Sequence, residues 1–297
     1  MAIRKNKLRI GGRNARRSAP GAAHADVHAA SVEAVERPRR RGIYLLPNLF
    51  TTAALFCGFY AIVQGMNRNF DHAAVAIFVA MVLDSMDGRV ARWTNTQSAF
   101  GAEYDSLSDM VSFGAAPALV AYEWALKGMG KLGWIAAFIY VAGAALRLAR
   151  FNTNIGIVDK RFFQGLPSPA AAALVAGFVW VMNDYGIDGD SLRWPAWVIT
   201  IYAGLSMVSN APFYSFKDVN FKKSVPFIAV FAVALGFGLV AYEPPTVLFG
   251  MFCLYGLSGF VLFFKRLASG RAGPLISTQP DTDIGPGAKD AEDASGR

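Results

Sequence analysis

Long apolar stretches separated by short polar links dominate the middle of the chain. Eight of them lie between residues 43 and 265, and most approach the roughly 20 residues that a helix needs to cross a bilayer. They span residues 44–65, 73–93, 104–125, 132–151, 168–183, 194–213, 225–242 and 246–264. Only Glu243, Pro244 and Pro245 separate the last two, and such a break is typical of a tight hairpin between helices. The pattern predicts an all-α fold, a polytopic transmembrane helix bundle of about eight spans.

The composition agrees with a membrane protein. Hydrophobic residues make up 54% of the 297 residues and charged residues only 17%, whereas an average soluble domain carries about 25% charged residues. This balance argues against a disordered chain and against an ordinary soluble enzyme. The two ends are more polar and show no sustained apolar period. We therefore expect a disordered basic arm over 1–42, a membrane domain over 43–265 and a disordered tail over 266–297.

Positive charge is concentrated in the N-terminal arm. Residues 1–42 hold 11 of the 29 Lys and Arg residues but only 3 of the 21 acidic residues. Lys and Arg mark the cytoplasmic side of membrane proteins, and they are also enriched in every second link between the predicted spans. Both termini are therefore predicted to be cytoplasmic, in a protein of the cytoplasmic (inner) membrane. A basic arm beside a span is more typical of contact with anionic lipids than of nucleic-acid binding, so we expect membrane lipids and no nucleic acid as partners.

Four acidic residues lie inside the second and third apolar stretches. Asp84 and Asp87 are three residues apart, and Asp105 and Asp109 are four apart, so each pair shares one face of its helix. The short link 94–103 makes the two helices antiparallel neighbours, so that the four carboxylates can converge. Ionised carboxylates inside a bilayer are costly unless they are paired or coordinated. Salt bridges to nearby arginines are the alternative explanation, but four acids in two helical registers exceed what packing needs.

The residue types around these carboxylates favour a hard divalent cation and a phosphate ligand. The chain has two Cys and no His after His72, which argues against a zinc site of the His and Cys type. Oxygen ligands favour Mg²⁺ or Mn²⁺, and one or two such ions would offset the repulsion between the acids. Gly88 and Gly101 remove side chains where a ligand must come close, and Arg92 could hold a phosphate. A diphosphate that bridges the metals and the arginine is the simplest substrate for such a site.

The spacing Asp84-x2-Asp87-Gly88-x2-Ala91-Arg92-x8-Gly101-x3-Asp105-x3-Asp109 resembles in full the signature of the CDP-alcohol phosphotransferase family. The resemblance implies six core helices around a cytoplasm-facing site with two metal ions. It implies that all four aspartates ligate metal and that Asp109, rather than Asp105, is the base for the acceptor hydroxyl. The alcohol then attacks the β-phosphorus and CMP leaves. The residues that the resemblance and the motif assign to binding CDP-diacylglycerol are Asp84, Gly88, Arg92, Gly101, Asp105, Asn48 and Thr51.

Three further stretches narrow the choice of the acceptor alcohol. Residues 47–51, 145–152 and 163–170 are similar to the integral-membrane phosphatidylserine synthases of that family, which implies transfer of the phosphatidyl group to L-serine. Simpler interpretations give these stretches no role in acceptor choice. The first would be only a helix start with Pro in its first turn and a capping hydroxyl, and the last only a rigid turn before the fifth span. Arg147 and Arg150 are predicted to share a helix face on the side where the aspartates open. They would bind the serine carboxylate or a lipid phosphate, or serve only as positive-inside anchors.

Two alternatives to serine transfer remain. The same chemistry would serve glycerol 3-phosphate, inositol or its phosphate, or choline as the acceptor, and charge alone does not decide among them. A cation transporter that uses the aspartates as its ion site is a more remote alternative, disfavoured by the strict motif spacing. A homodimer is an open possibility for the assembly.

Overall fold

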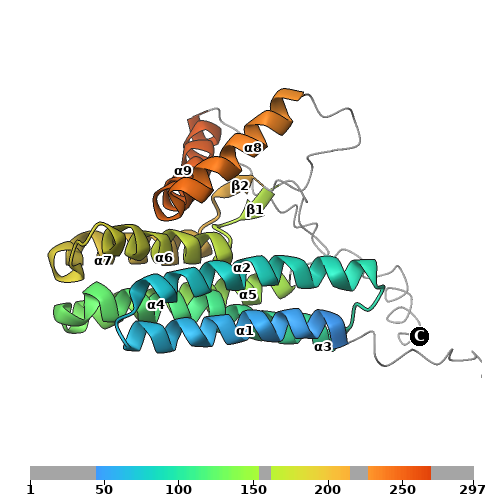
Figure 1. The fold of residues 1–297 in the computed structure, drawn as a ribbon, viewed down its shortest axis with the longest axis horizontal. Coiled ribbons are helices and arrows are strands. Elements are labelled where there is room, and N and C mark those ends of the chain that lie inside the picture. Colours follow the sequence, from blue (N-terminus) through green and yellow to red (C-terminus); the bar gives the residue numbers. More distant parts are fainter. Residues whose placement is uncertain (1–44, 154–161, 215–226, 269–297) are drawn as a thin grey trace, which may run out of the picture. The chain divides into compact units, whose positions relative to one another are not determined.

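The computed structural model describes residues 45–153, 162–214 and 227–268. The predicted arm over 1–42 lies outside the described residues, as does the predicted tail from residue 269 onward. Figure 1 shows most of the helices running alongside one another, with the last two helices of the chain inclined to the rest.

The protein is mostly helical, as the hydrophobic pattern predicts. The longer helices are α1 (Leu45–Met66), α2 (Phe70–Trp93), α3 (Ala99–Asp109), α5 (Lys131–Thr153), α6 (Ser168–Asp184), α7 (Arg193–Val208), α8 (Phe227–Tyr242) and α9 (Pro244–Ala268). The third predicted span continues from α3 through η1 (Met110–Ala115), α4 (Ala116–Ala121), η2 (Tyr122–Leu126) and η3 (Lys127–Met129). A short 3₁₀ turn, η4 (Gly189–Leu192), precedes α7. The η1 and η2 segments are π-helical turns, which the sequence pattern does not reveal.

The helices match the predicted stretches closely, with one correction. The stretch over 194–213 was predicted to be helical throughout, but α7 ends at Val208 because Ser209 takes an extended conformation with ψ 159°. Helix α9 continues to Ala268, and the bounds of the membrane domain stay a prediction. The hairpin between the last two stretches is confirmed, since α8 ends at Tyr242 and α9 begins at Pro244.

A small antiparallel ribbon departs from the expected all-α fold. Strand β1 (Phe162–Gln164) pairs with β2 (Pro212–Tyr214), and Phe163 lies opposite Phe213. The ribbon joins the segment before α6 to the segment after α7. It therefore fixes the start of α6 relative to the end of α7.

Three segments of the described residues are long and apolar enough to cross a membrane: Leu46–Met66, Lys131–Thr153 and Pro244–Phe263. Helix α8 adds a shorter apolar segment, Val230–Tyr242. The count of eight spans and the cytoplasmic position of both termini stay predictions.

Small residues allow the helices to approach closely. Helix α6 contacts α2, α4, α7 and α9, and its side chains from Ala170 to Val179 are buried. Helices α5 and α7 come together where Gly143 faces Gly204, and a Cβ on either glycine would run into the backbone of the other helix. Such small-residue contacts are the usual way in which membrane helices pack.

Serine hydroxyl groups of α3 and η1 form hydrogen bonds to the backbone of α1. Ser108 Oγ donates to the Thr51 carbonyl oxygen at 3.1 Å, and Ser112 Oγ donates to the Ala54 carbonyl oxygen at 3.1 Å. On the other side, α1 packs extensively against α2. The two helices that carry the acidic pairs therefore share α1 as a packing partner.

Candidate active site

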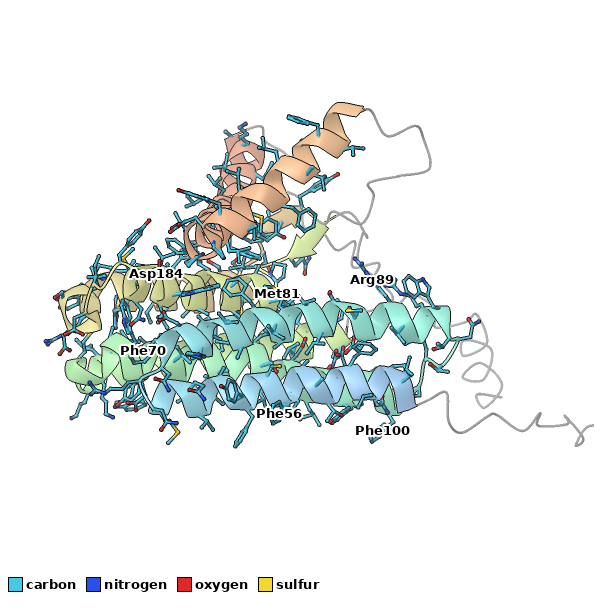
Figure 2. The ribbon with its side chains drawn as sticks, viewed as in Figure 1. Phe56, Phe70, Met81, Arg89, Phe100 and Asp184 are labelled. Atoms are coloured by element: carbon cyan, nitrogen blue, oxygen red, sulfur yellow. The ribbon has the colours of Figure 1, made fainter. Side chains whose placement is uncertain are left out.

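A pocket opens at the end of the bundle where α1 begins, α2 ends and α3 begins. Figure 2 labels Arg89 on α2 and Phe100 on α3, which mark this end. The pocket has a volume of about 300 Å³. Its lining consists of Pro47, Asn48, Thr51, Asp87, Gly88, Ala91, Arg92, Thr96, Gln97, Ser98, Gly101, Ala102 and Asp105. Seven of the predicted site residues therefore contribute to one pocket: Asn48, Thr51, Asp87, Gly88, Arg92, Gly101 and Asp105.

Three of the four aspartates form a compact cluster beside this pocket. One carboxylate oxygen from each of Asp84, Asp105 and Asp109 lies within 4.8 Å of the others. The Oδ1 atoms of Asp105 and Asp109 are buried and have no hydrogen-bond partner among the described residues. Among the residues that the structure describes, no Lys or Arg nitrogen lies within 4.0 Å of these carboxylates. Salt bridges to arginine, the alternative weighed from the sequence, therefore do not account for the cluster.

The fourth aspartate, Asp87, lies at the edge of the cluster and borders the pocket. Its side chain is 6% exposed, and its Oδ2 accepts a hydrogen bond of 2.8 Å from Thr51 Oγ1. Its Oδ1 accepts from the backbone N–H of Gly88. Asp87 also lies close enough to Asp105 for the two carboxylates to interact. Three of the four acids that were predicted to converge therefore form the cluster. The fourth, Asp87, interacts with the cluster at Asp105.

The two motif glycines have different surroundings. A Cβ on Gly88 would meet no heavy atom of the described residues within 4 Å, although this residue lines the pocket. Packing therefore does not require glycine there, and the space beside it is open to a ligand. A Cβ on Gly101 would lie 3.1 Å from Ser98 Oγ and 3.5 Å from Asn48 Oδ1. Ser98 caps α3 by accepting a hydrogen bond of 3.0 Å from the Gly101 N–H, so Gly101 lies at a tight helix start.

Arg92 lines the pocket from the last turn of α2. Its Nε donates to the Gly88 carbonyl oxygen at 3.0 Å, one helical turn earlier. This contact directs the side chain back along α2 toward the pocket. The terminal nitrogens make no hydrogen bond or ion pair among the described residues. They are suited to bind an anionic group.

The arginines of α5 diverge, although their spacing places them on one helix face. Arg147 Nη1 donates to Ser168 Oγ at 2.7 Å, and its guanidinium interacts electrostatically with Asp109 and Asp84. Arg150 Nη1 instead donates to Asn210 Oδ1 at 3.3 Å, beyond the end of α7. Arg147 is therefore the arginine that faces the acidic cluster.

Ser168 was not singled out as a site residue from the sequence. It is fully buried at the start of α6 and accepts the hydrogen bond from Arg147. In the sequence it appears only as part of a turn before the fifth span. Its position after Pro167, at the same end of the bundle as the end of α5, is the signal that could have indicated it.

The cluster fits a hard divalent cation. All of its donors are carboxylate oxygens, the ligands that Mg²⁺ and Mn²⁺ prefer. Two of its buried oxygens have no hydrogen-bond partner in the part of the chain that the structure describes, and a buried carboxylate oxygen needs either a donor or a cation. Asp84, Asp105 and Asp109 could therefore hold a metal ion, and Asp87 lies near enough to contribute.

Comparison with known proteins connects this geometry to one family. The model of the CDP-alcohol phosphatidyltransferase family matches residues 44–208, which include α1 to α7, the whole lining of the pocket and all four aspartates. A CDP-diacylglycerol–serine O-phosphatidyltransferase of Helicobacter pylori (strain ATCC 700392 / 26695) is 36% identical over 226 residues, which cover 76% of this chain and 94% of that protein.

Relatives from other domains of life carry the same name. The protein of Methanocaldococcus jannaschii is 38% identical over 190 residues, covering 64% of this chain and 83% of its own length. That of Saccharomyces cerevisiae is 32% identical over 200 residues, covering 63% of this chain and 64% of its own length. Both are named CDP-diacylglycerol–serine O-phosphatidyltransferases.

Proposed function

The chain belongs to the CDP-alcohol phosphatidyltransferase family, and from that premise we propose that it transfers the phosphatidyl group of CDP-diacylglycerol to L-serine, releasing CMP. The observation that carries this proposal is the cluster of Asp84, Asp105 and Asp109 beside a pocket large enough for a nucleotide head group. The names of the relatives support serine as the acceptor.

The CDP moiety would occupy the pocket at the end of the bundle. The open space beside Gly88 supports close approach of the diphosphate to α2, and the Arg92 guanidinium is available to pair with a phosphate oxygen. Asn48 and Thr51 of α1 and Gly101 of α3 complete the walls of this binding site. Thr51 would also hold the Asp87 carboxylate in place through their hydrogen bond.

We assign Asp84, Asp87, Asp105 and Asp109 to the binding of Mg²⁺ or Mn²⁺, with two ions per site. The absence of a basic partner within 4.0 Å, among the described residues, supports this assignment. When bound, the ions would neutralise the diphosphate and stabilise CMP as the leaving group. The protein contributes by holding the carboxylates on α2 and α3, which both pack against α1.

Asp109 would act as the base for the acceptor. Its carboxylate takes the proton of the serine hydroxyl, and the hydroxyl oxygen forms a bond to the β-phosphorus. The bond between this phosphorus and the bridging oxygen of the diphosphate breaks, and CMP leaves with the electron pair. Asp109 lies at the deep end of the cluster, directly before the π-helical turn η1, whose Phe113 carbonyl oxygen accepts a hydrogen bond of 3.0 Å from Tyr140. This contact supports a fixed position for the base.

Arg147 would bind the serine carboxylate. One of its five N–H groups donates to Ser168, so the others remain available to a ligand. Its electrostatic interaction with Asp109 supports a position beside the proposed base. Arg150, which turns toward Asn210, is the weaker candidate for this role.

We further propose that the enzyme lies in the cytoplasmic membrane with its pocket facing the cytoplasm. The pocket lies at the end of the bundle where α1 begins, next to the strongly basic N-terminal arm in the sequence. The positive-inside rule supports a cytoplasmic position for this end.

One assay tests the reaction and the acceptor together. The purified protein is incubated with CDP-diacylglycerol, Mg²⁺ or Mn²⁺, and one alcohol at a time: serine, glycerol 3-phosphate, inositol, inositol phosphate or choline. CMP release is measured, with Asp109→Asn as the inactive control. We expect release with serine. Release with another acceptor alone would refute serine as the substrate, and no release with any acceptor from a folded, metal-loaded protein would refute the transferase function.

A further inference from the structure

Helix α5 forms hydrogen bonds to the third helical run on both sides of Asp109 in the sequence. The Tyr140 hydroxyl donates a hydrogen bond of 3.0 Å to the Phe113 carbonyl oxygen, which lies after Asp109 in η1. Asn152 Nδ2 donates a hydrogen bond of 3.0 Å to Ser106 Oγ, which lies before Asp109 in α3. Helix α5 itself carries none of the four aspartates. It nevertheless contacts the chain on either side of the residue that is proposed as metal ligand and base.

The Tyr140 bond is made where the helix lacks one of its own donors. In a regular α-helix the Phe113 carbonyl oxygen would accept from the N–H of residue 117, but Pro117 has no N–H. The Tyr140 hydroxyl supplies a donor to this oxygen, and both Tyr140 and Phe113 are fully buried. A buried carbonyl oxygen that loses its donor is costly, so this bond restrains the π-helical turn that directly follows Asp109.

Close packing keeps the Tyr140 hydroxyl at this position. A Cβ on Gly114 of η1 would lie 3.3 Å from the Cβ of Ala144, one turn after Tyr140 on α5. Helix α7 comes equally close, since a Cβ on Gly204 would lie 2.9 Å from Tyr140 Cα. Helix α5 therefore packs tightly against both η1 and α7 at the level of Tyr140.

The Asn152 bond lies at the other end of α5, beside another of the acids. Ser106 directly follows Asp105 in α3, and its hydroxyl donates to the Ala102 carbonyl oxygen at 3.1 Å while it accepts from Asn152. Because Asp105 and Ser106 belong to the same helical turn, a restraint on Ser106 also restrains Asp105. Asn152 closes the stretch 145–152 that the sequence singles out, and the proposed function gives it no role.

The clustered acids need such restraints. One carboxylate oxygen from each of Asp84, Asp105 and Asp109 lies within 4.8 Å of the others, and like charges at this separation repel one another. Hydrogen bonds before and after Asp109 oppose a shift of α3 and η1 that would spread the carboxylates. They therefore favour the separations that a single cation can bridge.

We propose that Tyr140 and Asn152 are positioning residues, which hold Asp109 and Asp105 in the geometry that binds a divalent cation. The inference rests on the proposed function in one respect, the assignment of the aspartates to a metal ion. It adds α5 to the elements that build the metal site.

The first test measures Mn²⁺ binding to the purified protein without any substrate, from the EPR signal of the free ion. Tyr140→Phe and Asn152→Leu each remove one hydrogen bond and nearly keep the size of the side chain. We expect each substitution to raise the Kd for Mn²⁺ about threefold to tenfold, the usual range for one hydrogen bond. An unchanged Kd in either variant would overturn the role of that residue.

Two matched controls separate positioning from general stability. Tyr202→Phe removes a hydrogen bond of 2.9 Å from a tyrosine hydroxyl to the Gly256 carbonyl oxygen of α9. Asn183→Leu removes a hydrogen bond of 2.7 Å to Asp71 Oδ1, at the end of the bundle where Figure 2 labels Asp184. Both controls should lower the temperature of unfolding in detergent but leave the Kd for Mn²⁺ unchanged. An equal rise of the Kd in the controls would overturn the inference.

The second test asks whether Asn152 acts through Ser106. Ser106→Ala removes the acceptor of the same hydrogen bond, and the double variant Ser106→Ala, Asn152→Leu completes a double-mutant cycle. We expect the two substitutions together to raise the Kd no further than either alone. Effects that multiply would refute the route through Ser106. Asn152 is only half-buried, so this cycle remains a test even if Tyr140→Phe does not fold.

The absence of substrate separates this inference from the proposed function. A protein that binds Mn²⁺ but releases no CMP with any acceptor would refute the transferase function and leave the positioning roles to be decided by the Kd values. A protein with its native sequence that binds no Mn²⁺ would refute both the metal assignment and this inference. Equal Kd values in the native protein and in all variants would refute this inference alone.

Discussion

Replacement of Gly88 by Ala should raise the stability of this protein but lower its activity. Gly88 lies within α2, where glycine is less favourable than alanine by about 1 kcal/mol. A Cβ at this position would meet no heavy atom within 4 Å in the ranges 45–153, 162–214 and 227–268, so the substitution causes no clash with these parts of the protein. We therefore expect Gly88→Ala to raise the free energy of unfolding by up to about 1 kcal/mol.

The same methyl group should weaken substrate binding. Gly88 lines the pocket of about 300 Å³, and the proposed diphosphate site lies beside it. A methyl group forced into a filled site costs about 1–3 kcal/mol, which corresponds to a roughly fivefold to hundredfold rise in the KM for CDP-diacylglycerol. The KM for serine should change less, because the proposed acceptor site lies near Arg147.

The assay combines thermal unfolding in detergent with CMP release at varied CDP-diacylglycerol concentration. Gly236→Ala on α8 is the matched control, because a Cβ there also meets nothing within 4 Å but the residue does not line the pocket. It should gain stability and keep its KM. Gly143→Ala is the opposite control, since its Cβ would run into the Gly204 backbone and should destabilise the protein. A Gly88→Ala variant with an unchanged KM for CDP-diacylglycerol would refute the idea that the substrate uses this space.

Three further predictions concern the acids, the hydroxyl that supports one of them, and the arginines. Chelation should abolish CMP release and Mg²⁺ or Mn²⁺ should restore it, and Asp→Asn at any clustered position should lower the rate at least about a hundredfold; activity in excess chelator would exclude a metal-dependent site. Thr51→Val, which removes the hydrogen bond to Asp87, should lower kcat/KM about tenfold or more, whereas Thr52→Val should not; equal losses would indicate a packing effect. Arg147→Lys should raise the KM for serine about tenfold to a hundredfold while Arg150→Lys leaves it nearly unchanged, and the reverse result would exchange their roles.

Much of the helical framework follows from the sequence because membrane helices need long apolar stretches. The start of α6 and the ends of α2 and α8 coincide with the boundaries of the stretches in the sequence. The ribbon could not be predicted, since strands of three residues are too short to show alternation and Pro212 disfavours a strand. The extended conformation of Ser209 leads from α7 toward β2, which pairs with β1, and this turn is not visible in the apolar pattern either.

The candidate site was predictable as a set of residues but not as an arrangement. Helical spacing places Asp105 and Asp109 on one face, and they do lie together. The same rule places Arg147 and Arg150 on one face, but their long side chains turn to different partners. Spacing governs where a Cβ points, whereas the end of an arginine side chain follows the hydrogen-bond acceptors within its reach. Short acidic side chains are therefore better predicted than long basic ones.

The arrangement of the acids depends on α1, which carries none of them. Thr51 of α1 donates through its hydroxyl to Asp87 on α2 and accepts through its carbonyl oxygen from Ser108 on α3. One residue, itself 4% exposed, thus contacts both of the helices that bring the carboxylates together. Like charges this close destabilise one another whenever the site lacks cations. Fastening each helix to α1 keeps the carboxylates in place before a metal or substrate arrives, which is what a preorganised site requires.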